Sequence, residues 1–78
     1  MNWYTRWRLR RKWNKVGASN GCSIIRMDHD PCILVKPSLP VRPRDLDRLV
    51  RLARDLHTEF PLVKVEIDCT VLVLAEDS

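Results

Sequence analysis

The sequence has few of the features that mark phosphate-binding enzymes, membrane proteins or secreted proteins. It contains only two glycines among 78 residues, so it lacks a glycine-rich loop of the kind that cradles phosphates. No apolar run approaches the roughly 20 residues that cross a bilayer, and the N-terminus lacks the uncharged apolar stretch of a signal peptide. We therefore expect a cytoplasmic protein without membrane insertion.

Cysteine is also scarce, and its count is odd. Cys22, Cys32 and Cys69 are irregularly spaced, which is not the pattern of a disulfide framework. The residues of the run DHD at 28–30, just before Cys32, are of types that can bind a metal ion. Their spacing matches no standard zinc site, however, and a hairpin turn explains the same residues. Free cysteines are more often small buried hydrophobes than nucleophiles. We predict no metal, no cofactor and no enzymatic activity.

Acidic residues are absent from the first fifteen positions. This segment carries six Lys or Arg, a net charge of +6, whereas the rest of the chain carries eight Lys or Arg and ten Asp or Glu, a net charge of −2. A basic leader on a near-neutral body indicates an anionic partner. The segment also holds all three tryptophans and the tyrosine, and rings among cations can stack on bases or make cation–π contacts. The predicted partner- or nucleic-acid-binding residues are Trp3, Tyr4, Arg6, Trp7, Arg8, Arg10, Arg11, Lys12, Trp13 and Lys15.

The aromatic and basic residues of this leader separate onto two sides better with a period of two than on a helical wheel. With period two, Trp3 and Trp7 fall on one side and the arginines at 6, 8 and 10 fall on the other. Trp, Tyr and Thr also favour strands. Within a basic, Trp-rich segment of residues 1–15 we predict a strand over 3–11, with a helix or a disordered arm as the alternatives. A loop over 14–21 follows.

Residues 43–60 predict an amphipathic helix, because their apolar positions recur at steps of three and four. Pro43 suits the first turn, and Pro61 ends the helix near Phe60. The arginines and aspartates of the other face predict a solvent-exposed surface linked by salt bridges. The predicted buried face consists of Leu46, Leu49, Val50, Ala53, Leu56 and Phe60.

Apolar runs at 22–27 and 32–36, joined by a turn, predict a β-hairpin. Alternation over 62–75 predicts a further strand whose odd-numbered residues face the helix, and the helix between two strands completes a β-α-β crossover. We predict one α+β domain over 1–78, with a three- to five-stranded sheet and one amphipathic helix, 43–60, packed on one face. The opposite face would be half solvated, or covered by the N-terminal segment or by a second copy in a homodimer.

Because no catalytic constellation emerges, we predict a small regulatory or inhibitory binding protein. It would dock on another protein that has an acidic or nucleic-acid-binding surface, as phage and mobile-element inhibitors do, a likeness of character and not of motif. The alternative is a module that binds DNA or RNA directly through the basic-aromatic segment. Docking on a protein is favoured, because so small a core leaves surface tryptophans for a partner to bury.

Overall fold

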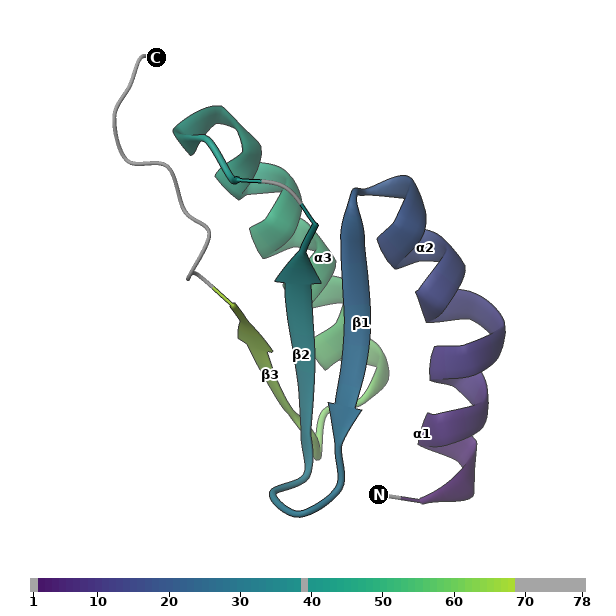
Figure 1. Cartoon of the computed structure of the whole chain (residues 1–78). Coiled ribbons are helices and arrows are strands. Elements are labelled where there is room, and N and C mark those ends of the chain that lie inside the picture. Colours follow the sequence, from purple (N-terminus) through teal and green to yellow (C-terminus); the bar gives the residue numbers. More distant parts are fainter. Residues whose placement is uncertain (1, 39, 69–78) are drawn as a thin grey trace.

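The computed structural model describes residues 2–38 and 40–68. Over these residues the chain forms a three-stranded mixed sheet with two helices packed beside it (Figure 1). This arrangement confirms the α+β class, with three strands and with two helices in place of the single predicted one. In chain order the elements are α1 (Trp3–Arg8), the π-helical η1 (Leu9–Trp13), α2 (Asn14–Ser19), β1 (Cys22–Met27), β2 (Cys32–Pro37), the 3₁₀ turn η2 (Pro43–Asp45), α3 (Leu46–Glu59) and β3 (Lys64–Ile67).

The N-terminal helix is the main correction to the sequence-based prediction. Because α1, η1 and α2 follow one another without a gap, the strand expected over 3–11 and the loop expected over 14–21 are both wrong. The Asn2 side chain caps the first turn by accepting a hydrogen bond from the backbone N–H of Thr5 at 2.8 Å. After the last turn, Gly21 adopts a φ of 71° and donates its N–H to the carbonyl of Ala18. Glycine takes this left-handed conformation without steric penalty, so it ends the helix.

A row of residues spaced four apart holds this helix against the rest of the molecule. Thr5, Leu9, Trp13 and Gly17 are all buried. Four residues of a regular α-helix turn through about 400°, so such a row would drift by about 40° at each step. The wider π-helical turn of η1, in which Asn14 donates its N–H to the carbonyl of Leu9, offsets this drift. An ordinary helical wheel mixes the tryptophans with the arginines because Trp3 and Trp7 lie on the exposed side of this helix.

Helix α3 confirms the helix predicted over 43–60, but its buried face is rotated from the predicted one. Leu52 is buried at 4% exposure, whereas Leu46 and Val50, both predicted to be buried, are 37% and 46% exposed. The N-terminal helix packs beside α3, where the indole N–H of Trp13 reaches Glu59. The prediction placed only the sheet against α3, so it missed this second neighbour and the shift of the buried stripe toward Leu52.

The sheet has the predicted hairpin and crossover. Strands β1 and β2 are antiparallel, with Ile25 opposite Leu34, and β2 and β3 are parallel on either side of the α3 connection. The β2 side chains of Ile33 and Val35 are fully buried, and Val65 of β3 packs against the same core. Of the strand predicted over 62–75, Lys64–Ile67 is observed. Residues 62 and 63 belong to the turn before it, and residues 69–75 of that prediction, with Cys69, lie outside the described residues.

Both helices lie away from the face of the sheet that carries Ile25. In Figure 1, α3 passes behind the sheet and the N-terminal helix runs beside β1. A Cβ on Gly17 would lie 2.8 Å from Ile24, so Ile24 points toward this helix. Its neighbour Ile25 points to the opposite face, because side chains alternate along a strand, and it is 38% exposed. The N-terminal segment therefore does not cover that face, as one alternative had supposed.

Candidate functional site

All ten predicted binding residues lie on the N-terminal helix, but the fold divides them among four directions. Trp13 points into the core and is only 4% exposed. Tyr4, Arg8 and Lys12 lie on the side next to α3, where they contact Phe60 or Glu59. Arg6 and Arg10 lie on the side next to β1. The exposed outer row comprises Trp3, Trp7, Arg11 and Lys15.

The Glu59 carboxylate fixes the N-terminal helix to α3. It accepts a hydrogen bond from Arg8 Nε at 2.8 Å, one from the indole N–H of Trp13 at 3.2 Å and one from Lys12 Nζ at 3.3 Å. Burial by itself would raise the pKa of Glu59, but the hydrogen bonds from Arg8 and Lys12, with the attraction of both charges, hold that pKa below its ordinary value. The carboxylate in turn raises the pKa of Arg8. Two predicted binding cations are thus committed to the fold.

A second ion pair attaches the helix to the hairpin. Asp28, in the turn between β1 and β2, lies 3.2 Å from Arg6 and 3.5 Å from Arg26. These side chains are between 39% and 47% exposed, so solvent weakens the attraction. The pairing still removes Arg6 from the set of cations without a partner.

The aromatic side chains form a connected group at the beginning of the helix. The ring centroid of Tyr4 is 6.3 Å from that of Trp3, 6.4 Å from that of Trp7 and 6.4 Å from that of the buried Phe60. Trp3 is 75% exposed, Trp7 46% and Tyr4 45%. Phe60 therefore fixes the position of Tyr4, and the three rings of the helix leave a contiguous apolar surface open to solvent.

Three cations of the helix have no ion pair within residues 2–38 and 40–68. Arg10, Arg11 and Lys15 are exposed and lie in the half of the helix that follows the aromatic group. The Arg11 guanidinium lies 5.9 Å from the centroid of the Trp7 ring, as does that of Arg8. We call the surface made by these rings and unpaired cations the aromatic-basic face. Its members are Trp3, Tyr4, Trp7, Arg10, Arg11 and Lys15.

The arginines of η2 and α3 also differ from the prediction. In the part of the chain that the structure describes, Arg44, Arg48, Arg51 and Arg54 form no salt bridge with the aspartates beside them. This exposed surface mixes four cations with three aspartates, so it has little net charge. It therefore lacks the single-sign field of the N-terminal helix.

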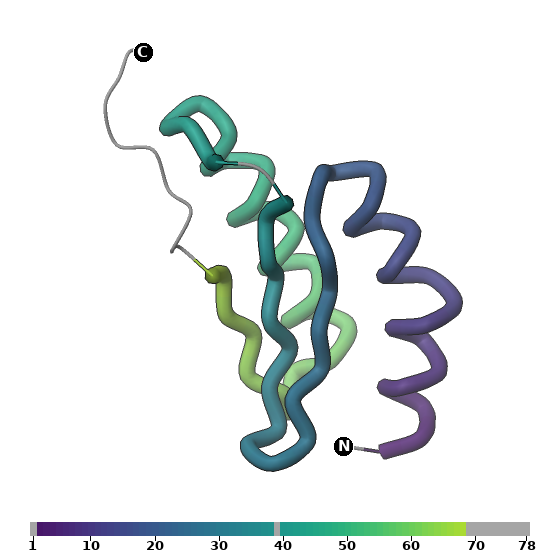
Figure 2. The backbone as a smooth tube through the Cα atoms, viewed as in Figure 1, coloured from purple at the N-terminus to yellow at the C-terminus, as the bar shows by residue number. Residues whose placement is uncertain are grey.

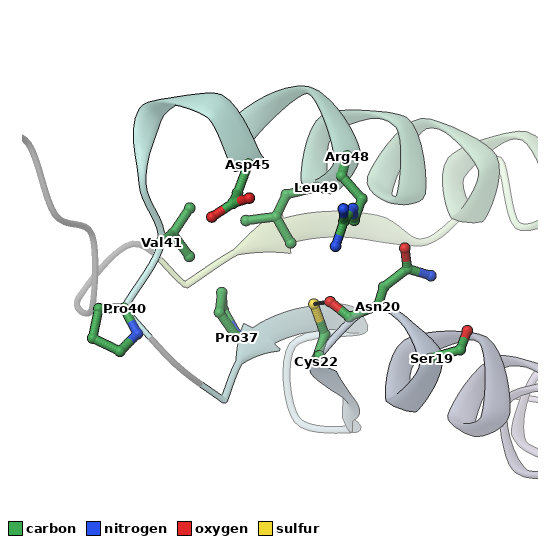
Figure 3. Close-up of a pocket in the computed structure, with 10 residues that line it drawn as sticks. Ser19, Asn20, Cys22, Pro37, Pro40, Val41, Asp45, Arg48 and Leu49 are labelled. Atoms are coloured by element: carbon green, nitrogen blue, oxygen red, sulfur yellow. Dashed lines mark hydrogen bonds between the residues drawn. The ribbon is translucent and has the colours of Figure 1, made fainter. Parts of the chain in front are cut away.

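A hollow of about 220 Å³ lies where the turn after α2 meets the beginning of α3 (Figure 3). Figure 3 shows Arg48 reaching from α3 toward Cys22 and Asn20. Burial raises the pKa of the Cys22 thiol, only partly offset by the Arg48 charge, and the thiol donates to the carbonyl of Asn20 at 3.4 Å. A neutral, hydrogen-bonded thiol is a poor nucleophile, and the hollow is smaller than most small-molecule sites.

The cysteine and acidic residues considered for metal binding are not gathered into a site. Cys22 and Cys32 are free and buried, and Asp28 is engaged by arginines. Within the described segments, no group of three or more His, Cys, Asp or Glu side chains is arranged to hold a metal ion. The turn at residues 28–31 is the hairpin turn expected from its composition.

Two residues with an unusual environment, Glu59 and Leu62, were not among the predicted binding residues. Glu59 is an ordinary acid near a helix end, and only the packing of two helices gives it three donors. Leu62 follows Pro61 in the connection to β3 and is 96% exposed. Pro61 favours a turn directly after the helix, and connecting segments run over the surface, so the proline is a signal that could have identified Leu62 as a surface residue.

Comparison with known proteins adds no relative. No family model matches the sequence, and neither the curated proteins nor the solved structures contain a significant match. Across the described residues, no helix combines the length and the apolar character needed to span a bilayer.

Proposed function

We propose that this chain is a small, non-enzymatic regulatory or inhibitory protein that docks on a second protein through the aromatic-basic face. The exposure of three adjoining rings supports this proposal: Trp3 is 75% exposed, and Trp7 and Tyr4 are nearly half exposed. Trp, Tyr and Arg are the side chains that most often dominate the binding energy of protein interfaces. The helix that carries them is already ordered by its buried row, so little conformational freedom is lost when it binds.

The charge of the face identifies the kind of protein that fits it. Arg10, Arg11 and Lys15 have no carboxylate partner among the described residues, and the helix itself carries no acid. A basic, nucleic-acid-binding surface would be repelled by this helix. An acidic protein surface would be attracted, and long-range attraction of this kind mainly accelerates association. We therefore narrow the partner to a protein with an acidic surface.

Direct binding of DNA or RNA is the second candidate, because the same three cations could neutralise phosphates. The environment of Trp7 argues for the protein partner. Two guanidinium groups already lie over this ring, each 5.9 Å from its centroid, so a base could stack there only by displacing one of them. A protein side chain can instead pack on the exposed edge of the ring.

The first test is affinity purification from nuclease-treated extract with the full chain as bait. Trp7→Ala should no longer capture a specific acidic protein that the wild-type chain captures. Once that protein is isolated, its affinity for Trp7→Ala should be lower by roughly tenfold or more, because tryptophan is enriched among the interface residues whose truncation costs about 2 kcal/mol or more. Val50→Ala is the matched control, since Val50 has the same 46% exposure but lies on α3. Equal loss with both variants would contradict the proposed face.

The second test separates the two candidates by titration against random DNA and RNA at two salt concentrations. If the three unpaired cations contact phosphates, the log–log salt slope should be about −2 to −3, and Arg11→Ala should reduce its size by about 0.7–0.9. Arg51→Ala, an exposed cation of α3, is the control. We expect only weak, sequence-independent binding at physiological salt. Tight binding with the Arg11-dependent slope would favour the nucleic-acid module instead.

A further inference from the structure

The most exposed large apolar side chain lies outside the N-terminal helix. Leu62 is 96% exposed. It occupies a tight turn in which the N–H of Val63 donates to the carbonyl of Phe60 at 3.1 Å. Pro61 takes the second position of this turn, where its fixed φ is favourable, and Leu62 takes the third. The turn is thus closed by a hydrogen bond and stiffened by a proline, and it holds a leucine in water.

This turn lies next to the aromatic group. Phe60, the first residue of the turn, is buried and its ring contacts that of Tyr4 at 6.4 Å. Residues two apart in a chain have Cα atoms within about 7 Å of each other, so the Cα of Leu62 is held within that distance of the Cα of Phe60, whose ring contacts Tyr4. Figure 2 shows the beginning of the N-terminal helix and the connection from α3 to β3 at the same end of the molecule.

We infer that the docking surface continues from the aromatic rings onto Leu62, so that it has an apolar centre at this end and a cationic flank farther along the helix. This inference rests on the proposed function. The aromatic group centres near residue 5 and the unpaired cations centre near residue 12, which at 1.5 Å per residue places the two parts roughly 10 Å apart. The occupant is an amphipathic segment on a protein surface, with apolar side chains at one end and carboxylates at the other.

The order of the rings supports a protein as the occupant. Tyr4 is fixed by Phe60, and Trp7 is flanked by Arg8 and Arg11, so the apolar centre has a defined shape before binding. Complementary shape around rigid aromatic anchors is the property that protein pockets recognise. A nucleic acid would bind the cationic flank but would make no favourable contact with Leu62. A lipid surface would bind apolar and cationic side chains without requiring the cations to lie on one side of the apolar centre.

The test uses the full chain and two synthetic 20-residue peptides of equal composition. In one, the leucines and tryptophans fill one half and the glutamates fill the other. In the second, the same residues alternate. The segregated peptide should bind several-fold more tightly than the alternating one, and Leu62→Ser should weaken it by about tenfold, the effect of losing one buried leucine side chain. Leu62→Ser should fold normally, because the side chain touches little, and thermal melting verifies this.

The variants distinguish this inference from the proposed function. If Trp7→Ala weakens the segregated peptide but Leu62→Ser does not, the docking face stands and its extension to Leu62 is refuted. If neither variant weakens binding of the segregated peptide, both the proposed docking face and its extension to Leu62 are refuted. Random DNA and vesicles of phosphatidylserine and phosphatidylcholine serve as further probes, because they offer anionic groups without a protein surface. Arg51→Ala, which removes one exposed cation outside the N-terminal helix, controls for the effect of net charge on binding to them. Leu62-dependent binding to the vesicles, or equal binding of the two peptides, would also overturn the inference.

Discussion

Glu59 offers the sharpest test of how the N-terminal helix is attached. Its carboxylate accepts hydrogen bonds from Arg8, Lys12 and Trp13. Glu59→Ala leaves the indole N–H of Trp13, a residue only 4% exposed, without its acceptor, and an unsatisfied buried donor costs about 1–3 kcal/mol. In a domain of this size each kcal/mol lowers the thermal midpoint by about 4–8 °C. A loss of about 2 kcal/mol therefore lowers it by about 8–16 °C.

Glu59→Gln separates the charge from the hydrogen bond. Glutamine can still accept from Trp13, but it no longer attracts the two cations, so the loss should be about 1 kcal/mol, the difference between charged and neutral hydrogen bonds. Asp55→Asn is the matched control, because Asp55 lies one turn earlier on α3, is exposed, and has no ion pair in the described part of the chain. Its effect should stay within about 0.5 kcal/mol.

The pH dependence gives an independent measure of the same contact. The pKa of Glu59 is lower in the folded chain than its ordinary value of about 4.3. The unfolded chain therefore takes up the proton first as the pH falls. The stabilisation is complete above the ordinary value and is lost as the pH falls through the folded one. Denaturant melts between about pH 6 and pH 3 should show a smaller acid loss for Glu59→Gln than for wild type. Identical acid profiles would refute the assigned role of Glu59.

Three further predictions concern the core and the thiols. Leu52→Ala should destabilise the fold by about 2–5 kcal/mol in denaturant melts and Val50→Ala by much less; the reverse order would restore the helix face expected from the sequence. Gly17→Ala should lower stability by about 1–2 kcal/mol despite the better helix propensity of alanine, because the new Cβ would lie 2.8 Å from Ile24; adding Ile24→Ala should recover part of the loss, and no recovery would exclude the steric cause. Native Cys22 should react slowly with thiol reagents near pH 8, since burial raises its pKa, and mass spectrometry of the labelled peptide measures this; rapid labelling would show an accessible thiolate.

Local patterns predicted the hairpin, helix α3 and the parallel crossover correctly. These elements are specified by short-range chemistry: alternation in the strands, a turn of aspartates and proline at 28–31, and prolines at both ends of the helix. The exact face of α3 could not be predicted in the same way. Which of Leu46, Val50 and Leu52 is buried depends on where a second helix packs, and this neighbour was itself predicted as a strand.

The leader was predicted wrongly because its tryptophans do not share one face of the helix. Trp13 and Leu9 are buried while Trp3 and Trp7 are exposed, so a helical wheel that is searched for a single apolar face finds the tryptophans among the arginines. The composition of the candidate site was nonetheless visible, since the unpaired cations and the open rings all come from the basic, Trp-rich segment. The sequence could not show that Glu59 and Asp28 engage half of its cations, because both acids are far away in the chain.

The π-helical segment Leu9–Trp13 holds one residue more in its turn than a regular α-helix would. A deletion of one residue there, for example of Arg10, would let the segment relax into a regular α-helix, with Leu9 and Trp13 three positions apart in place of four. Residues three and four apart share a face of an α-helix, so the buried row would still point inward and the rings at the start of the helix would keep their direction relative to Lys15. An insertion of one residue in α1 or α2 has no such turn to absorb it and would rotate everything before it by about 100°. The helix can therefore shorten by one residue at this segment without changing the surface that it presents.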